Sequence, residues 1–89
     1  MANDLSRNPW SLDTAAVITT DKVRVKSLRW YTKSATAGDD ISVEDAHGEK
    51  IWESVADGSN YVEAQLIEED FEGFELAVID SGVLYVMVG

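Results

Sequence analysis

His47 is the only histidine of the chain, and the sequence contains no cysteine. Nucleophilic or acid–base catalysis at neutral pH most often uses one of these side chains beside a second polar group. His47 lies within Asp45-Ala46-His47-Gly48, a run of turn-forming residues that we expect to be exposed to solvent. The sequence therefore predicts a protein that is not an enzyme.

Acidic side chains could supply other chemistry. Asp39, Asp40, Glu44 and Asp45 carry oxygen ligands suited to calcium, but they lack the spacing and the central glycine of a calcium-binding loop. The denser acidic cluster at residues 68–72 is typical of a solvated face. A carboxylate pair of the glycosidase kind stays open on composition alone. No metal ion or cofactor is expected.

Three basic side chains, Lys22, Arg24 and Lys26, alternate with valines and therefore share one face of a predicted strand, about 6–7 Å apart. One interpretation is an edge strand protected by its charges. The other is a binding surface for an acidic partner. Residues 63–75 are themselves acidic, so identical copies could meet head to tail.

Three tryptophans are further candidates for recognition. Trp30 and Trp52 lie within strand patterns, and we expect both in the core. If both were exposed, they would instead suggest a surface for stacking carbohydrate rings. Trp10 lies outside the strand patterns and needs a groove or a partner to cover it.

The charge of the chain restricts its partners. The 89 residues carry a net charge of −10, which disfavours nucleic acid and anionic membrane surfaces. Residues 1–33 hold six of the seven basic side chains and three of the 17 acidic ones, so the two signs are separated along the sequence. No apolar run approaches the roughly 18 residues of a membrane helix. We expect synthesis in the cytoplasm.

Period-two patterns with turns between them predict an all-β fold. Lys22 to Lys26 alternates polar with apolar residues, and the phase changes before Leu28, so we expect a bulge near Ser27. Residues 74–79 and 83–88 form the clearest predicted hairpin, joined by Asp80-Ser81-Gly82. Its second arm is apolar on both faces, which predicts burial on both sides or a subunit interface.

Seven or eight short strands predict a small antiparallel β-sandwich or a partly open barrel at residues 14–89, as a single domain. Residues 1–13 show no sustained periodicity and predict an extended arm. The expected core comprises Val23, Val25, Leu28, Trp30, Ile41, Val43, Ile51, Leu66, Leu76, Val78, Leu84 and Val86.

The overall pattern resembles small virion structural proteins of tailed bacteriophages. The segments that carry the resemblance cover most of the chain: residues 8–13 (NPWSLD), 23–30 (VRVKSLRW), 37–39 (AGD), 51–55 (IWESV) and 81–86 (SGVLYV). The resemblance implies a capsid decoration or cement protein, or a neck or tail component, that is oligomeric, lacks catalytic residues and resides in the virion. A small carbohydrate-binding β-sandwich module is the alternative.

We expect the arm and the basic strand to bind the partner, which would be the phage capsid, another virion protein or a second copy. The candidate partner-binding residues are Pro9, Trp10, Leu12, Lys22, Arg24 and Lys26. An arm of this kind would be disordered in the isolated domain and would order against a neighbour, with Trp10 in an apolar pocket. Its removal would then leave the β domain folded.

Overall fold

The computed structural model describes residues 3–89, which form one antiparallel sheet of six strands without a helix. The strands are β1 (Trp10–Leu12), β2 (Ala16–Thr32), β3 (Asp40–Glu44), β4 (Lys50–Val55), β5 (Tyr61–Ile79) and β6 (Val83–Val88). Their order in the sheet is β1-β6-β2-β5-β3-β4. The sheet is open, because β1 and β4 end it on either side. No helix in residues 3–89 is long and apolar enough to cross a membrane.

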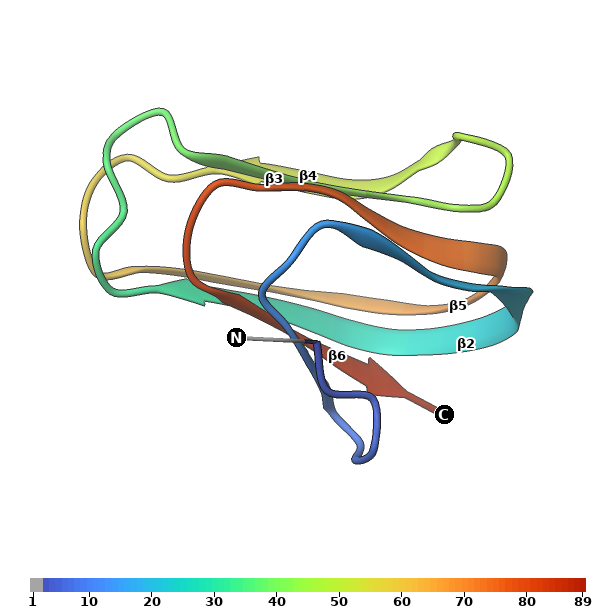
Figure 1. The fold of residues 1–89 in the computed structure, drawn as a ribbon. Coiled ribbons are helices and arrows are strands. Elements are labelled where there is room, and N and C mark those ends of the chain that lie inside the picture. The colour runs from blue at the N-terminus through green and yellow to red at the C-terminus, as the bar shows by residue number, and fades with distance from the viewer. Residues whose placement is uncertain (1–2) are drawn as a thin grey trace.

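The two longest strands, β2 with 17 residues and β5 with 19, bend. A straight strand of 17 residues would be about 56 Å long, whereas the longest dimension of the molecule is 34 Å. The register between β2 and β5 shifts at residues 17–22, and Gly73 of β5 has a φ of 94° there. The sheet therefore folds over, with β3 and β4 above and β2, β6 and the first half of β5 below (Figure 1).

The folded sheet has two halves. Residues 22–32 of β2 pair with residues 61–72 of β5, and residues 25–31 of β2 pair with β6, which in turn pairs with β1. Beyond the bend, residues 16–19 of β2 pair with residues 74–76 of β5, and β5 continues along β3, which pairs with β4. We call these the lower and the upper half, as they lie in Figure 1.

These pairings differ from three expectations. The structure has six strands and not seven or eight, because two pairs of predicted short strands are continuous as β2 and β5. The sheet is also continuous, so separate sheets of a sandwich are not confirmed. Residues 74–79 and 83–88 do not pair with each other: the Asp80–Gly82 connection takes the chain from the upper half to the lower half. Turn residues alone do not distinguish a hairpin from such a crossing.

The core lies between the halves. Trp30 and Phe74 are its largest side chains, both 0% exposed, and the Trp30 ring meets Tyr61 edge to face at 5.6 Å. The bulge between Val25 and Ser27 is confirmed, and it lets Val25, Leu28 and Trp30 all face inward. The buried apolar residues are Leu12, Val25, Leu28, Trp30, Ala35, Ile41, Val43, Ala56, Phe74, Leu76, Leu84 and Val86.

Four members of the expected core differ from that set. Val23 and Ile51 are half-buried and pack at its margin, whereas Leu66 and Val78 are exposed. Leu66 pairs with Ser27, and Val78 pairs with Ser42, on the outer side of the sheet in each case. A one-residue difference in register reverses the face of a strand residue, and the sequence pattern does not fix it.

The crossing at Asp80–Gly82 is anchored to the end of β2. The Trp30 Nε1 donates a hydrogen bond to the Ser81 carbonyl at 2.9 Å, and the Thr32 and Ser81 hydroxyls lie 2.8 Å apart. Gly82 has a φ of 80°, and a Cβ there would lie 2.3 Å from the Tyr31 carbonyl oxygen. Only glycine satisfies both the backbone angle and this approach.

Gly82→Ala should therefore be strongly destabilising. The left-handed backbone costs an alanine about 1–2 kcal/mol, and overpacking against β2 adds roughly 1–3 kcal/mol. Gly48→Ala is the matched control, since Gly48 has a φ of 81° with no atom near the added Cβ. Denaturant unfolding of both variants measures the difference. Equal losses of stability would contradict the close contact at Gly82.

Candidate interaction surface

Nine side chains form the outer face of the lower half. Cross-strand partners share one face of a sheet, and the register gives three rows across β6, β2 and β5. The rows are Met87-Ser27-Leu66, Tyr85-Arg29-Ala64 and Val83-Tyr31-Val62. Seven of these side chains are apolar or aromatic, and Arg29 is the single charged one. We call these nine residues the outer apolar face.

Much of this apolar surface is open to solvent. Leu66 is 68% exposed, Val62 51%, Tyr31 41% and Met87 38%. Exposed apolar residues scattered singly are ordinary, but a contiguous patch is typical of an interaction site. The expectation that β6 is buried on both faces is thus not met within the chain: Leu84 and Val86 are buried, while Met87 remains exposed. The subunit-interface alternative stays open.

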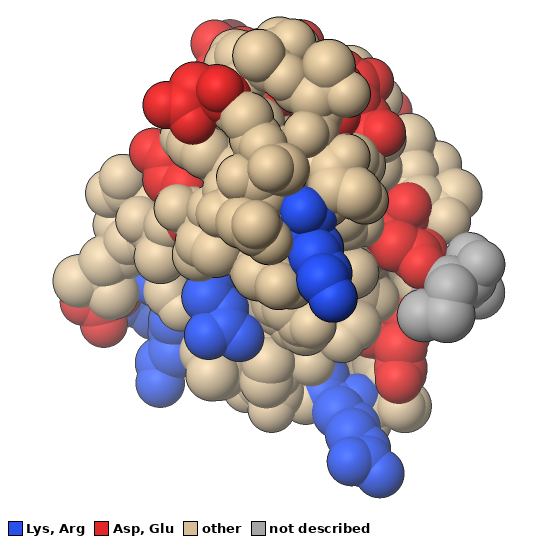
Figure 2. Space-filling model, turned by 90° about the vertical axis from the view of Figure 1, so that its left-hand side faces the viewer, with Lys and Arg blue, Asp and Glu red and all other residues tan. Residues whose placement is uncertain are grey.

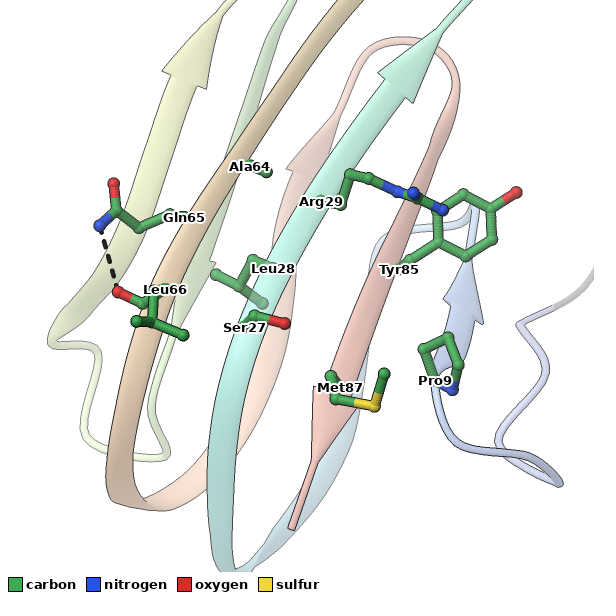
Figure 3. Close-up of a pocket in the computed structure, with 9 residues that line it drawn as sticks. All are labelled: Pro9, Ser27, Leu28, Arg29, Ala64, Gln65, Leu66, Tyr85 and Met87. Atoms are coloured by element: carbon green, nitrogen blue, oxygen red, sulfur yellow. Dashed lines mark hydrogen bonds between the residues drawn. The ribbon is translucent and has the colours of Figure 1, made fainter.

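A shallow hollow of about 400 Å³ opens at one end of the outer apolar face. Leu66 from β5 and Met87 from β6 lie on either side of Ser27, and Pro9 closes the far side (Figure 3). The Arg29 guanidinium lies 5.0 Å from the centre of the Tyr85 ring, a cation–π distance. The hollow is therefore apolar with one cation at its margin.

The N-terminal segment belongs to this half of the sheet. Trp10 and Leu12 lie in β1, paired with Val86 and Leu84 of β6. Leu12 is 0% exposed, and the half-buried Trp10 ring meets Phe74 edge to face at 6.0 Å. The Asn8 amide exchanges hydrogen bonds with the Val88 backbone at 2.6 and 2.9 Å. An extended arm is thus not confirmed, because Trp10 and Leu12 find their apolar contacts within the chain. Met1 and Ala2, the start of the expected arm, lie outside the described residues.

The expected basic strand is matched by acidic residues of the same chain. Lys22 and Arg24 lie 3.7 and 3.2 Å from the carboxylate of Asp70, and the Arg24 guanidinium also donates to the Glu68 carbonyl. Lys26 makes no ion pair within residues 3–89. All three side chains are exposed, so these pairs add little stability. Cross-strand pairing explains the alternation without a partner, and partner binding by these residues stays a prediction.

The upper half carries mainly acidic residues, whereas the lower half carries both signs, because residues 61–72 of β5 hold five acidic residues beside the basic ones of β2. Figure 2 shows Lys and Arg over the lower part of the molecule and Asp and Glu over the top and flanks. The cause is that β2, in the lower half for most of its length, carries four of the seven basic residues. Residues 34–60, which include β3 and β4, hold seven acidic residues against Lys50 alone.

Two carboxylates meet where the upper half ends. The Asp40 backbone N–H donates to the Asp80 carboxylate at 2.9 Å, and the Asp80 N–H donates to the Asp40 carbonyl at 3.0 Å. A hydrogen bond with the Asp80 carboxyl, which needs a proton, raises the pKa of Asp40 above its ordinary value of 3.8. Desolvation and the charges of Asp80, Glu53 and Asp39 raise this pKa further.

Other candidate residues are not assembled into a site. His47 is exposed in the turn between β3 and β4, with Nε2 3.4 Å from the Glu72 carboxylate. No group of three ligating side chains in residues 3–89 could hold a metal ion. Trp30 is fully buried, so it forms no exposed stacking surface with Trp52.

Sequence reasoning missed Tyr31, Leu66 and Met87 as surface residues. The sequence pattern places Leu66 in the core and gives Tyr31 no role, and for Met87 it gives only the general expectation that residues 83–88 are buried on both faces or lie in a subunit interface. The available signal was the apolar character of β6 on both faces, which indicated an excess of apolar surface but not its location.

Comparison of the chain with protein-family models, curated proteins and solved structures finds no match.

Leu12→Ala should destabilise the fold by about 2–5 kcal/mol, as truncation of a buried leucine does. Leu5→Ala is the matched control, because Leu5 is 44% exposed and its loss should change stability little. Deletion of residues 1–12 should also destabilise, unlike removal of a free arm. Thermal unfolding of the three variants measures this. Unchanged stability after the deletion would restore the arm hypothesis.

Asp80→Asn should raise the melting temperature at pH 7. The raised pKa means that ionised Asp40 is less stable in the folded state than in the unfolded chain. This loss of folding stability is present above the pKa of the folded state, and it vanishes as pH falls toward 3.8, the ordinary value. The amide oxygen still accepts from the Asp40 N–H. The gain should therefore be largely lost by about pH 4. Asp57→Asn, another exposed carboxylate, controls for net charge. An equal gain from both variants would exclude a specific Asp40–Asp80 effect.

Proposed function

We propose that this chain is a non-enzymatic structural protein of a tailed bacteriophage virion, a capsid decoration or cement protein that binds the shell and neighbouring copies. The observation that carries the proposal is the outer apolar face, an unpartnered three-strand surface with exposed Leu66, Val62 and Tyr31. A surface of this kind supports a role in assembly.

One feature of the sheet agrees with this role. Residues 25–31 of β2 pair with β5 on one side and with β6 on the other, so the outer apolar face rests on a paired central strand. A paired strand holds its side chains in fixed rows, which a repeated contact needs. The partner side chains then meet a preorganised surface.

The absence of an assembled catalytic group among the described residues is consistent with the proposal but does not carry it. His47 is remote from the outer apolar face, in the β3–β4 turn of the upper half. The hollow beside Leu66 and Met87 is lined by two ionisable side chains, Arg29 and Tyr85. A guanidinium stays protonated and serves for anion recognition and not for proton transfer.

The carbohydrate-binding alternative loses its main support from the geometry of the tryptophans. Trp30 is 0% exposed, and its indole N–H is used by the Ser81 carbonyl. Among the described residues, Trp10 and Trp52 are half-buried and lie on different strands, β1 and β4. A stacking platform needs exposed ring faces, which the Trp30–Trp52 pair does not provide.

Purified phage particles test the proposal. The chain should be found in them by quantitative mass spectrometry, at a copy number close to that of the major capsid protein. A ratio far below that of the capsid protein would assign it to the neck or tail, which contradicts the decoration role. Absence from particles whose genome encodes it would contradict the virion role altogether.

A further inference from the structure

A second outer surface, on the upper half, has the opposite charge. The register places Glu53, Ser42 and Val78 in one row across β4, β3 and β5, and Val55 opposite Asp40 in the next. We call these five residues the acidic face. Val55 is 58% exposed, Val78 is 37% exposed, and the Glu53 side chain is 66% exposed. The acidic face therefore combines exposed valines with carboxylates, of which Glu53 lies 3.6 Å from the Lys50 ammonium, a cation that also donates to the Ser42 hydroxyl.

The two faces point in opposite directions. The core lies between the halves, so the outer apolar face is directed away from the lower half and the acidic face away from the upper half (Figure 1). Figure 2 shows carboxylates over the top and down both flanks of the molecule, and cations over its lower part. Two copies in the same orientation could stack lower face on upper face.

Arg29 indicates what the covering surface must contain. Its guanidinium lies over Tyr85 and makes no ion pair with any carboxylate in residues 3–89. A partner that covers the outer apolar face would remove water from this cation, which is costly unless a carboxylate replaces the water. Two further cations flank the outer apolar face in the sequence: Lys33 lies two residues after Tyr31, and Lys26 comes directly before Ser27. The partner must be apolar and acidic.

We propose that the partner is a second copy of this chain, whose acidic face docks on the outer apolar face head to tail. This inference rests on the proposed function, since it names the surfaces by which neighbouring copies meet. Val55 and Val78 of one copy cover the apolar side chains of the next, and Glu53 lies against Arg29. Contact between two outer apolar faces would bury Arg29 of each copy without a carboxylate, since Arg29 is the single charged residue of that face.

The size of the surface sets the strength of the contact. Three strands about 4.8 Å apart and five residues along each strand span on the order of 250 Å², below the roughly 800 Å² per partner of a standard stable interface. The contact is thus weak between two free copies and gains strength by repetition on a scaffold. Self-association should be detected at concentrations from about 0.1 to 1 mM.

Charge exchange tests the contact directly. Sedimentation equilibrium of the full chain should show association that Arg29→Glu and Glu53→Lys each weaken at least about tenfold. A mixture of the two variants should associate again, because Glu at position 29 then meets Lys at position 53. Glu49→Lys, the same charge change in the β3–β4 turn, is the control and should not act in this way.

The other outcomes overturn the inference. A chain that stays monomeric up to about 1 mM excludes the second copy as occupant. Association lost in Leu66→Asp but unchanged in Glu53→Lys indicates a contact between two outer apolar faces. A mixture of Arg29→Glu and Glu53→Lys that fails to associate excludes the head-to-tail pairing. None of these results bears on incorporation into particles, which tests the proposed function separately.

Discussion

The shared bend of β2 and β5 is the constraint on which the rest of the structure depends. Each strand is too long to lie straight within the molecule, and because they are paired on both sides of the bend, they must turn together. The turn brings the inner side chains of both halves into one core around Trp30 and Phe74. It also leaves two outer faces that no part of the described chain covers.

The sequence predicts local features of this fold better than long-range ones. The bulge near Ser27 is predictable because Val23 and Val25 alternate in one phase and Leu28 and Trp30 in the other. These apolar residues can all face the core only if an extra residue shifts the phase between the two pairs. The β3–β4 hairpin follows from the turn residues between two short apolar runs. Both depend on residues close together in the chain.

The features that were not predicted depend on distant pairings. Leu66 has the alternation of a core residue, and only its register opposite Ser27 directs it outward. The Asp80–Gly82 turn is equally compatible with a hairpin and with the observed crossing, and contacts with Trp30 and Thr32 fix the latter. Trp10 and Leu12 occupy a strand of three residues, too short for a period to be recognised. The outer apolar face needs all these registers at once.

The pairing of β1 with β6 has a mechanical consequence. Asn8 is joined to Val88 by two hydrogen bonds, so the residue before β1 and the end of β6 are held together at one end of this strand pair. Tension applied between Asn8 and Val88 would open β1 from β6 one residue pair at a time, because antiparallel strands pulled from the same end separate pair by pair. The domain resists such tension poorly. A load is better borne across the faces of the sheet, where many side chains share it, than through the pairing of β1 with β6.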